Sequence, residues 1–219
     1  VDVDDIGGGV IRHQQAADKP SYQPKQLVRV RPGTMPLILS APHGGKFDVP
    51  QVDERKGEGL PTGGAGFVNL RDVNTDKLAQ QLVEAVEQRF WKTPYVVLSR
   101  AHRKYIDMNR PAHIAYEDTD AKPHYDAYHT ALQHACRDVQ QRFGRGLLLD
   151  LHGQSAACDT VFRGTQDGRT VTLLRERLGE AAHSGERSLF GMLKQRGWTV
   201  FPDPLTDKER PSFRGGYIV

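Results

Sequence analysis

Over residues 146–153 the chain reads Gly146-Leu147-Leu148-Leu149-Asp150-Leu151-His152-Gly153. An apolar run of this length that is bounded by glycines is typical of a strand buried on both faces of a parallel sheet. Such a strand has no use for an unpaired Asp or His, because burying either without a partner is costly. Ligands of open α/β sheets bind beyond the carboxyl ends of the strands. We therefore expect His152 to be a functional group at that edge of the sheet.

A second apolar run ends in the same way, in the stretch Met35-Pro36-Leu37-Ile38-Leu39-Ser40-Ala41-Pro42-His43-Gly44-Gly45. If the two strands are parallel neighbours, His43 and His152 leave the sheet at the same edge. Two neutral imidazoles that meet there predict a metal site, with zinc as the simplest choice and another divalent metal as an alternative. The structural alternative is a pair of hydrogen-bonded histidines at two strand ends.

The composition limits the class of protein. A chain of 219 residues with 37% hydrophobic and 26% charged residues can bury one good core. The formal net charge is +3 without a long Lys/Arg block, so we expect no nucleic-acid partner. No apolar run has the length of a membrane span, so we expect no membrane partner and, by default, a cytoplasmic protein. The oligomeric state stays open.

Apolar periodicity predicts a chain in which strands and helices alternate. We expect helices over residues 74–90, 124–143 and 184–196. We expect strands over 27–30, 35–41, 95–99, 160–162, 198–201 and 217–219, besides the strand that precedes His152. This order predicts the α/β class, as a single domain with a mostly parallel central sheet flanked by helices. Residues 1–34 would form an N-terminal arm or edge segment, and 35–219 the catalytic α/β domain.

A catalytic zinc site takes three protein ligands and leaves one position for water. Asp72 follows a long glycine-rich loop and precedes the helix over 74–90, so it is our candidate for the third ligand. The structural alternative is that Asp72 only caps that helix, and Asp48 is a weaker candidate ligand. Asp150 has the same strand parity as His152, so it could orient His152 or act as a catalytic general base.

The third dense polar stretch is Arg103-Lys104-Tyr105-Ile106-Asp107-Met108-Asn109-Arg110-Pro111. Arginine grips carboxylates with a two-pronged hydrogen bond, so Arg110, and after it Arg103, are candidates for holding a substrate carboxylate during catalysis. Asp107 and Asn109 would brace that loop. The alternative is an exposed polar loop with local salt bridges. Arg214 and His129 are further candidates for contacts with substrate.

Taken together, these stretches resemble the N-formylglutamate amidohydrolase family over about residues 35 to 218. The matching segments are Ser40-Ala41-Pro42-His43-Gly44-Gly45, Asp72-Val73-Asn74-Thr75-Asp76-Lys77-Leu78, the arginine stretch through Ile106-Asp107-Met108-Asn109-Arg110-Pro111, Tyr128-His129, Asp150-Leu151-His152-Gly153, and Phe213-Arg214-Gly215-Gly216-Tyr217-Ile218. The resemblance implies a zinc-dependent hydrolase with a zinc-exopeptidase (phosphorylase/hydrolase)-like fold. It implies His43 and His152 as metal ligands with Asp72 as the third, and a small N-acyl amino acid as substrate. The family reaction converts N-formylglutamate to formate and glutamate.

Two departures from the family pattern are visible. Gly44 and Gly153 stand where many members have serine. Members usually continue into another strand with a glutamate, the expected base, so we expect the domain to be incomplete beyond Val219. The alternatives are a zinc carboxypeptidase or another amidase, or a non-catalytic binding protein of the same fold.

Overall fold

The computed structural model describes residues 23–58 and 66–218 and builds them around a four-stranded sheet. The strand order is β1-β3-β2-β4, formed by β1 (Val28–Arg31), β2 (Leu37–Ala41), β3 (Tyr95–Ser99) and β4 (Leu147–Asp150). β3, β2 and β4 run parallel, and β1 pairs with β3 in the antiparallel direction. The predicted α/β class with a mostly parallel sheet is therefore confirmed.

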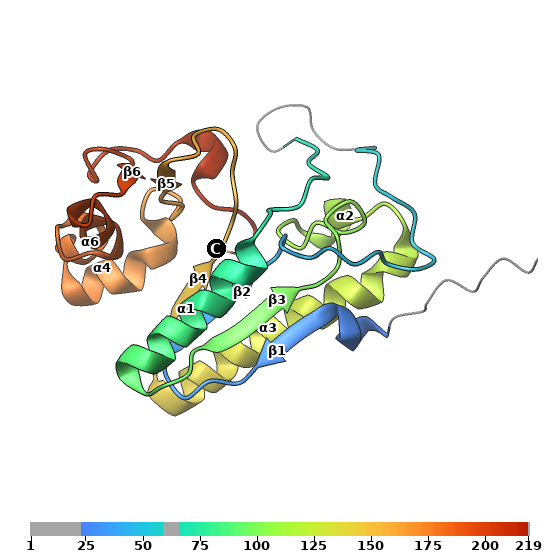
Figure 1. Ribbon diagram of the computed structural model, residues 1–219, viewed down its shortest axis with the longest axis horizontal. Helices are drawn as coiled ribbons and strands as arrows, with labels where there is room; N and C mark the ends of the chain where they lie inside the picture. Colours follow the sequence, from blue (N-terminus) through green and yellow to red (C-terminus); the bar gives the residue numbers. More distant parts are fainter. Residues whose placement is uncertain (1–22, 59–65, 219) are drawn as a thin grey trace, which may run out of the picture.

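The two faces of the sheet are covered by different helices (Figure 1). On one face, Leu39 and Ala41 pack with Ala79 and Val83 of α1 (Thr75–Phe90). On the other face, Ile38 and its neighbours pack against α3 (Lys122–Phe143) in the larger core cluster. Alternate side chains of one strand point to opposite faces, so both faces of β2 and β3 are apolar because both are covered.

The boundaries of α1 and α3 lie close to the predicted ones. α3 presents Tyr125, Tyr128, Leu132 and Val139 to the core and ends at Gly144, whose φ of 69° is the left-handed conformation that glycine adopts readily. The apolar spacing of the sequence predicts a buried face of α1 that consists of Leu78, Leu82, Val83, Val86 and Phe90, and this prediction is only partly correct. Leu78 and Phe90 are exposed, because the smaller residues Ala79 and Val83 make the close contact with the sheet.

A smaller unit follows β4 and sits beside the main sheet (Figure 1). It contains the parallel pair β5 (Thr160–Phe162) and β6 (Thr199–Phe201), with α4 (Thr172–Leu178), α5 (Ala181–Ser184) and α6 (Leu189–Gln195) between them. The single helix predicted over 184–196 is wrong in extent, since α5 and α6 are separate. A buried ion pair holds this unit together, in which Arg163 Nε donates to Glu209 Oε1 at 2.8 Å.

Two strand predictions need correction. β4 was expected to be buried on both faces, but it is an edge strand among the described residues, and Leu147 is exposed. Tyr217 and Ile218 are not in a strand, while Val219 lies outside the described residues. The remaining elements are the short helix α2 (Ala112–Ala115) and the 3-10 helices η1 (Pro24–Leu27), η2 (Thr119–Ala121), η3 (Arg169–Val171) and η4 (Pro211–Phe213).

Candidate metal centre

Three predicted ligands meet at the carboxyl edge of the sheet. β2 and β4 are parallel neighbours with Ser40 paired to Asp150, so the segments that carry His43 and His152 leave the sheet together. Asp72 arrives from the loop before α1, and one candidate ligand atom from each residue lies within 4.8 Å of the others. A Cβ at Gly44 would lie 2.7 Å from Thr75 Oγ1, so the glycine after His43 lets the start of α1 approach the strand end.

His43 is buried and its two ring nitrogens have different surroundings. Nε2 lies 2.7 Å from Asp107 Oδ1. Nδ1 lies 3.5 Å from Asp72 Oδ2 and has no hydrogen-bond partner among the described residues. An ionised carboxylate can only accept, so the hydrogen-bond network assigns the proton to Nε2. Nδ1 then presents a buried lone pair that only a proton or a metal can use.

His152 repeats this arrangement from the neighbouring strand. Its Nδ1 lies 3.0 Å from Asp72 Oδ2 and its Nε2 lies 2.9 Å from Asp150 Oδ2. Burial alone would lower the pKa of His152, but the hydrogen bonds with Asp150 and Asp72 outweigh this and raise the pKa to about 10. Without a metal, His152 is therefore an imidazolium between two carboxylates. Asp150 is held in turn by Ser40, whose hydroxyl donates to Oδ1.

Asp72 lies between the two imidazoles. Its Oδ2 also accepts the backbone N–H of Gly153 at 3.0 Å, and its Oδ1 lies 3.5 Å from Arg103. Burial raises the pKa of Asp72, yet the hydrogen bond with His152 and the nearby imidazole of His43 hold it well below its ordinary value. The N-cap position of α1 belongs to Asn74, and the Asp72 side chain does not cap the helix. The helix-cap alternative is therefore wrong for this side chain.

The arginine stretch is a buried segment. Asp107 is 1% exposed, and its Oδ2 accepts hydrogen bonds from Nε and Nη2 of Arg103 at 3.0 and 2.8 Å. Burial raises the pKa of Asp107, but the hydrogen bond with His43 and the charge of Arg103 keep it far below its ordinary value. The alternative of an exposed polar loop is wrong, because two opposite charges that pair inside the protein do not need solvent. Arg110 is only partly buried, and its carbonyl accepts from Tyr125.

Asn109 connects this segment to both ends of the site. Its backbone N–H donates to Asp107 Oδ1, its Oδ1 accepts from the N–H of Ile218 at 2.9 Å, and its Nδ2 lies 3.1 Å from His152 Nε2. A Cβ at Gly216 would lie 2.2 Å from Asn109 Nδ2. The C-terminal segment therefore packs directly on the residue that touches His152.

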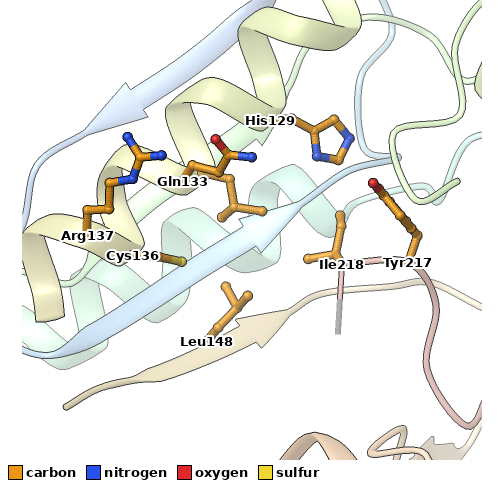
Figure 2. Close-up of a pocket in the computed structure, with 8 residues that line it drawn as sticks. His129, Gln133, Cys136, Arg137, Leu148, Tyr217 and Ile218 are labelled. Carbon is orange, nitrogen blue, oxygen red and sulfur yellow. The ribbon is translucent and has the colours of Figure 1, made fainter. Parts of the chain in front are cut away.

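Three other candidates lie outside this group. Arg214 is exposed on the C-terminal segment, and the exposed Asp48 pairs with Lys104. His129 donates from Nε2 to the carbonyl of Met108 and lines a pocket of about 420 Å³ between α3, β4 and Tyr217. Figure 2 shows His129 and Tyr217 at one end of this pocket, which none of the three candidate ligands lines.

Some residues of the site could not be chosen from the sequence. Ser40 holds Asp150 only because the strand register pairs them. Tyr128, whose hydroxyl is buried without a hydrogen-bond partner among the described residues, is close enough to Asp150 for that charge to raise its pKa further, after burial. Arg55 is a buried arginine from an irregular loop. Ser40 and Tyr128 lie in stretches that carry the family resemblance, but nothing in the sequence points to their place beside Asp150, and for Arg55 the only signal was the residue type.

This geometry fits a metal ion. Nδ1 of each histidine faces the same carboxylate oxygen of Asp72, and each histidine has its other nitrogen held by a second carboxylate. That carboxylate–histidine arrangement fixes the tautomer and ring orientation of metal ligands. The set His43, Asp72 and His152 could therefore bind a divalent metal ion, and zinc enzymes use three such ligands.

Comparisons with known proteins give a distant structural likeness and no match by sequence. No protein-family model matches the chain, and a search of curated proteins found no match. Among solved structures, an N-formylglutamate amidohydrolase from Ralstonia eutropha JMP134 is similar, with 19% identity and a TM-score of 0.48 over 86% of this chain and 82% of that chain. A likeness at this level assigns no residue a role, so the roles below rest on the geometry of the site. None of the described helices is long and apolar enough to cross a bilayer.

Proposed function

We propose that this chain is a metal-dependent hydrolase that cleaves the amide bond of an N-acyl amino acid, with N-formylglutamate as the first candidate substrate. The observation that carries the proposal is the unsatisfied, buried Nδ1 of His43, 3.5 Å from the same Asp72 oxygen that faces Nδ1 of His152. An unpaired buried polar atom costs free energy. A metal ion held by His43, Asp72 and His152 would remove that cost.

The charges around the centre favour an anionic substrate. Asp72, Asp107 and Asp150 contribute three negative charges, and Arg55, Arg103 and the imidazolium of His152 contribute three positive ones. Exchange of the Nδ1 proton of His152 for a divalent cation leaves one surplus positive charge. An anion that reaches the centre would balance that charge, which supports a substrate with a carboxylate.

The residues of the chain divide the work between them. When bound, a zinc ion supplies a Lewis acid that polarises a carbonyl and lowers the pKa of water to about 7. Asp107 and Asp150 keep the two histidines in the tautomer that binds a metal. Arg110, which is only partly buried, is the first candidate for gripping the substrate carboxylate, with Asn109 bracing its loop. Arg103 contacts Asp107 and Asp72.

Both oxygens of Asp150 are already hydrogen-bonded, and its side chain is 1% exposed. This arrangement supports a positioning role for Asp150 over the role of general base. The reaction adds one water across the amide, so that the C–N bond breaks, the acyl carbon gains the oxygen and the leaving nitrogen gains a proton. With N-formylglutamate the products are formate and glutamate.

The experiment combines metal analysis with turnover. The purified protein should contain about one zinc per chain, and His43→Ala and His152→Ala should lose it while keeping the circular dichroism spectrum of the fold. Zinc-loaded protein should hydrolyse N-formyl-L-glutamate faster than the neutral amide N-formyl-L-norvalinamide. Full metal occupancy in both variants would reject the site, and equal rates on the two compounds would reject the anionic substrate. Metal binding without turnover on N-acyl amino acids or peptides would favour a binding protein.

A further inference from the structure

We propose that Arg55 is a positioning residue for the metal centre, which acts through Asp107 to hold His43 in its metal-binding tautomer. The inference rests on the proposed metal site and adds a residue to it. Arg55 is 4% exposed although it lies in the irregular loop after β2. Burying a guanidinium costs free energy unless it is paired with a negative charge. The nearest carboxylate to Arg55 is that of Asp107.

Arg55 joins the two segments that carry the carboxylates of the centre. Its backbone N–H donates to the carbonyl of Lys104 at 2.8 Å, in the segment of Asp107. Its Nη2 donates to the carbonyl of Val68 at 2.7 Å, and its guanidinium lies over the ring of Phe67. Both of these residues belong to the segment that leads into Asp72. One residue therefore links the segment of Asp107, through its backbone, to the segment that leads into Asp72, through its side chain.

The charge of Arg55 falls on the far side of Asp107 from the histidine. Nη1 of Arg55 lies 4.0 Å from Asp107 Oδ2, the oxygen that Arg103 also contacts. The other oxygen, Oδ1, accepts from His43 and from the backbone N–H of Asn109. Arg103 also faces Asp72, so its charge is shared between two carboxylates. Arg55 supplies a second positive charge beside the same oxygen, which helps hold the Asp107 carboxylate in place against His43.

The position of the Asp107 carboxylate decides which nitrogen of His43 is available. A carboxylate can only accept, so His43 must donate from Nε2 and leave Nδ1 as a lone pair toward Asp72. A weaker or displaced Asp107 would let the proton move to Nδ1, which would block the ligand atom. The effect of Arg55 on the metal is therefore indirect, through Asp107 and His43.

The test compares Arg55→Met and Arg55→Lys with Arg163→Met. Arg163 is a matched control, because it is also buried and also pairs with a buried carboxylate, Glu209, but lies in the smaller unit. Residues that orient metal ligands typically contribute 10- to 100-fold in metal affinity. We expect Arg55→Met to weaken Co²⁺ binding about tenfold, measured by competition with a chromophoric chelator. Arg55→Lys should restore most of that loss, and Arg163→Met should change the affinity of folded protein by less than about twofold.

A second readout reports on His43 directly. In ¹H–¹⁵N spectra of the imidazole groups, the Nε2 proton of His43 should give a slowly exchanging downfield resonance that Arg55→Met broadens and Arg163→Met leaves in place. Unchanged Co²⁺ affinity and an unchanged His43 resonance in Arg55→Met would overturn the inference while leaving the metal site intact. A wild-type protein that binds no Co²⁺ would overturn the metal site and the inference together. Equal losses in the Met and Lys variants would also overturn it, because they would point to packing and not to charge.

Discussion

Asp150→Asn should weaken zinc binding far more than it slows turnover at saturating zinc. Asparagine keeps the volume of aspartate but offers one acceptor and one donor where the carboxylate offers two acceptors. The Ser40 hydroxyl and His152 Nε2 both approach Asp150 as donors, so one of them loses its partner in the variant. The amide N–H also favours the tautomer of His152 with its proton on Nδ1, the nitrogen that faces Asp72.

The size of the effect follows from the bond that is lost. A hydrogen bond to a charged group contributes about 1.5–3 kcal/mol, which corresponds to roughly 10- to 150-fold in the dissociation constant of zinc. Chelator competition gives that constant, and kcat for N-formyl-L-glutamate is measured with zinc in excess. Ser40→Ala is the matched control, since it removes only the donor to Asp150 Oδ1 and should produce a smaller loss.

The opposite pattern would refute this reasoning. If Asp150→Asn takes up zinc with wild-type affinity and has no turnover, Asp150 is the general base and not a positioning residue. In that case its hydrogen bonds with Ser40 and His152 must rearrange when substrate binds.

Four further predictions follow, of which two concern pH, one the substrate anion and one the C-terminal segment. Zinc must displace the Nδ1 proton of His152, whose pKa is about 10, so zinc affinity should rise about tenfold per pH unit between roughly pH 7 and 9, and a flat profile would contradict this. The raised pKa also stabilises the metal-free fold fully below the ordinary pKa of 6.5, and thermal unfolding should show this contribution being lost as pH rises through about 10. Arg110→Lys keeps the charge but not the two-pronged grip, so kcat/KM for N-formyl-L-glutamate should fall roughly ten- to a hundredfold; unchanged kinetics would make Arg110 structural. Gly216→Ala should lower stability by about 1–3 kcal/mol in urea unfolding, because its Cβ would meet Asn109 at 2.2 Å, and a neutral result would mean that Asn109 moves freely.

The sequence predicted the sheet edge of the site well, because that part depends on local pattern. Apolar runs that end in His-Gly locate β2 and β4, and parallel pairing brings His43 and His152 to the same edge. The interior of the site could not be predicted in the same way. The segment around Asp107 is as charged as a surface loop. It can be buried because Asp107 pairs with Arg103 and Arg55, which offsets the cost of taking these charges out of water.

Long-range contacts explain the other differences as well. The face of α1 was chosen by its largest apolar residues, but the helix lies so close to the sheet that Ala79 and Val83 fit there while Leu78 stays exposed. Strand β4 is rich in leucine, a pattern of central strands, yet it lies at the edge of the described sheet. Composition gives the preference of a segment for burial, and the partners it finds decide the outcome.

Strand β1 has a consequence for anyone who shortens this chain. It pairs with residues 96–99 of β3, and its exposed residues include Arg29 and Arg31. Charged residues on an outer strand discourage other chains from adding to a sheet. A shortened chain that begins at residue 35 would keep every predicted ligand but would expose the backbone of β3, whose five residues are all buried here. Such a chain should self-associate through β3 during expression, so truncation should stop before residue 24, where η1 begins.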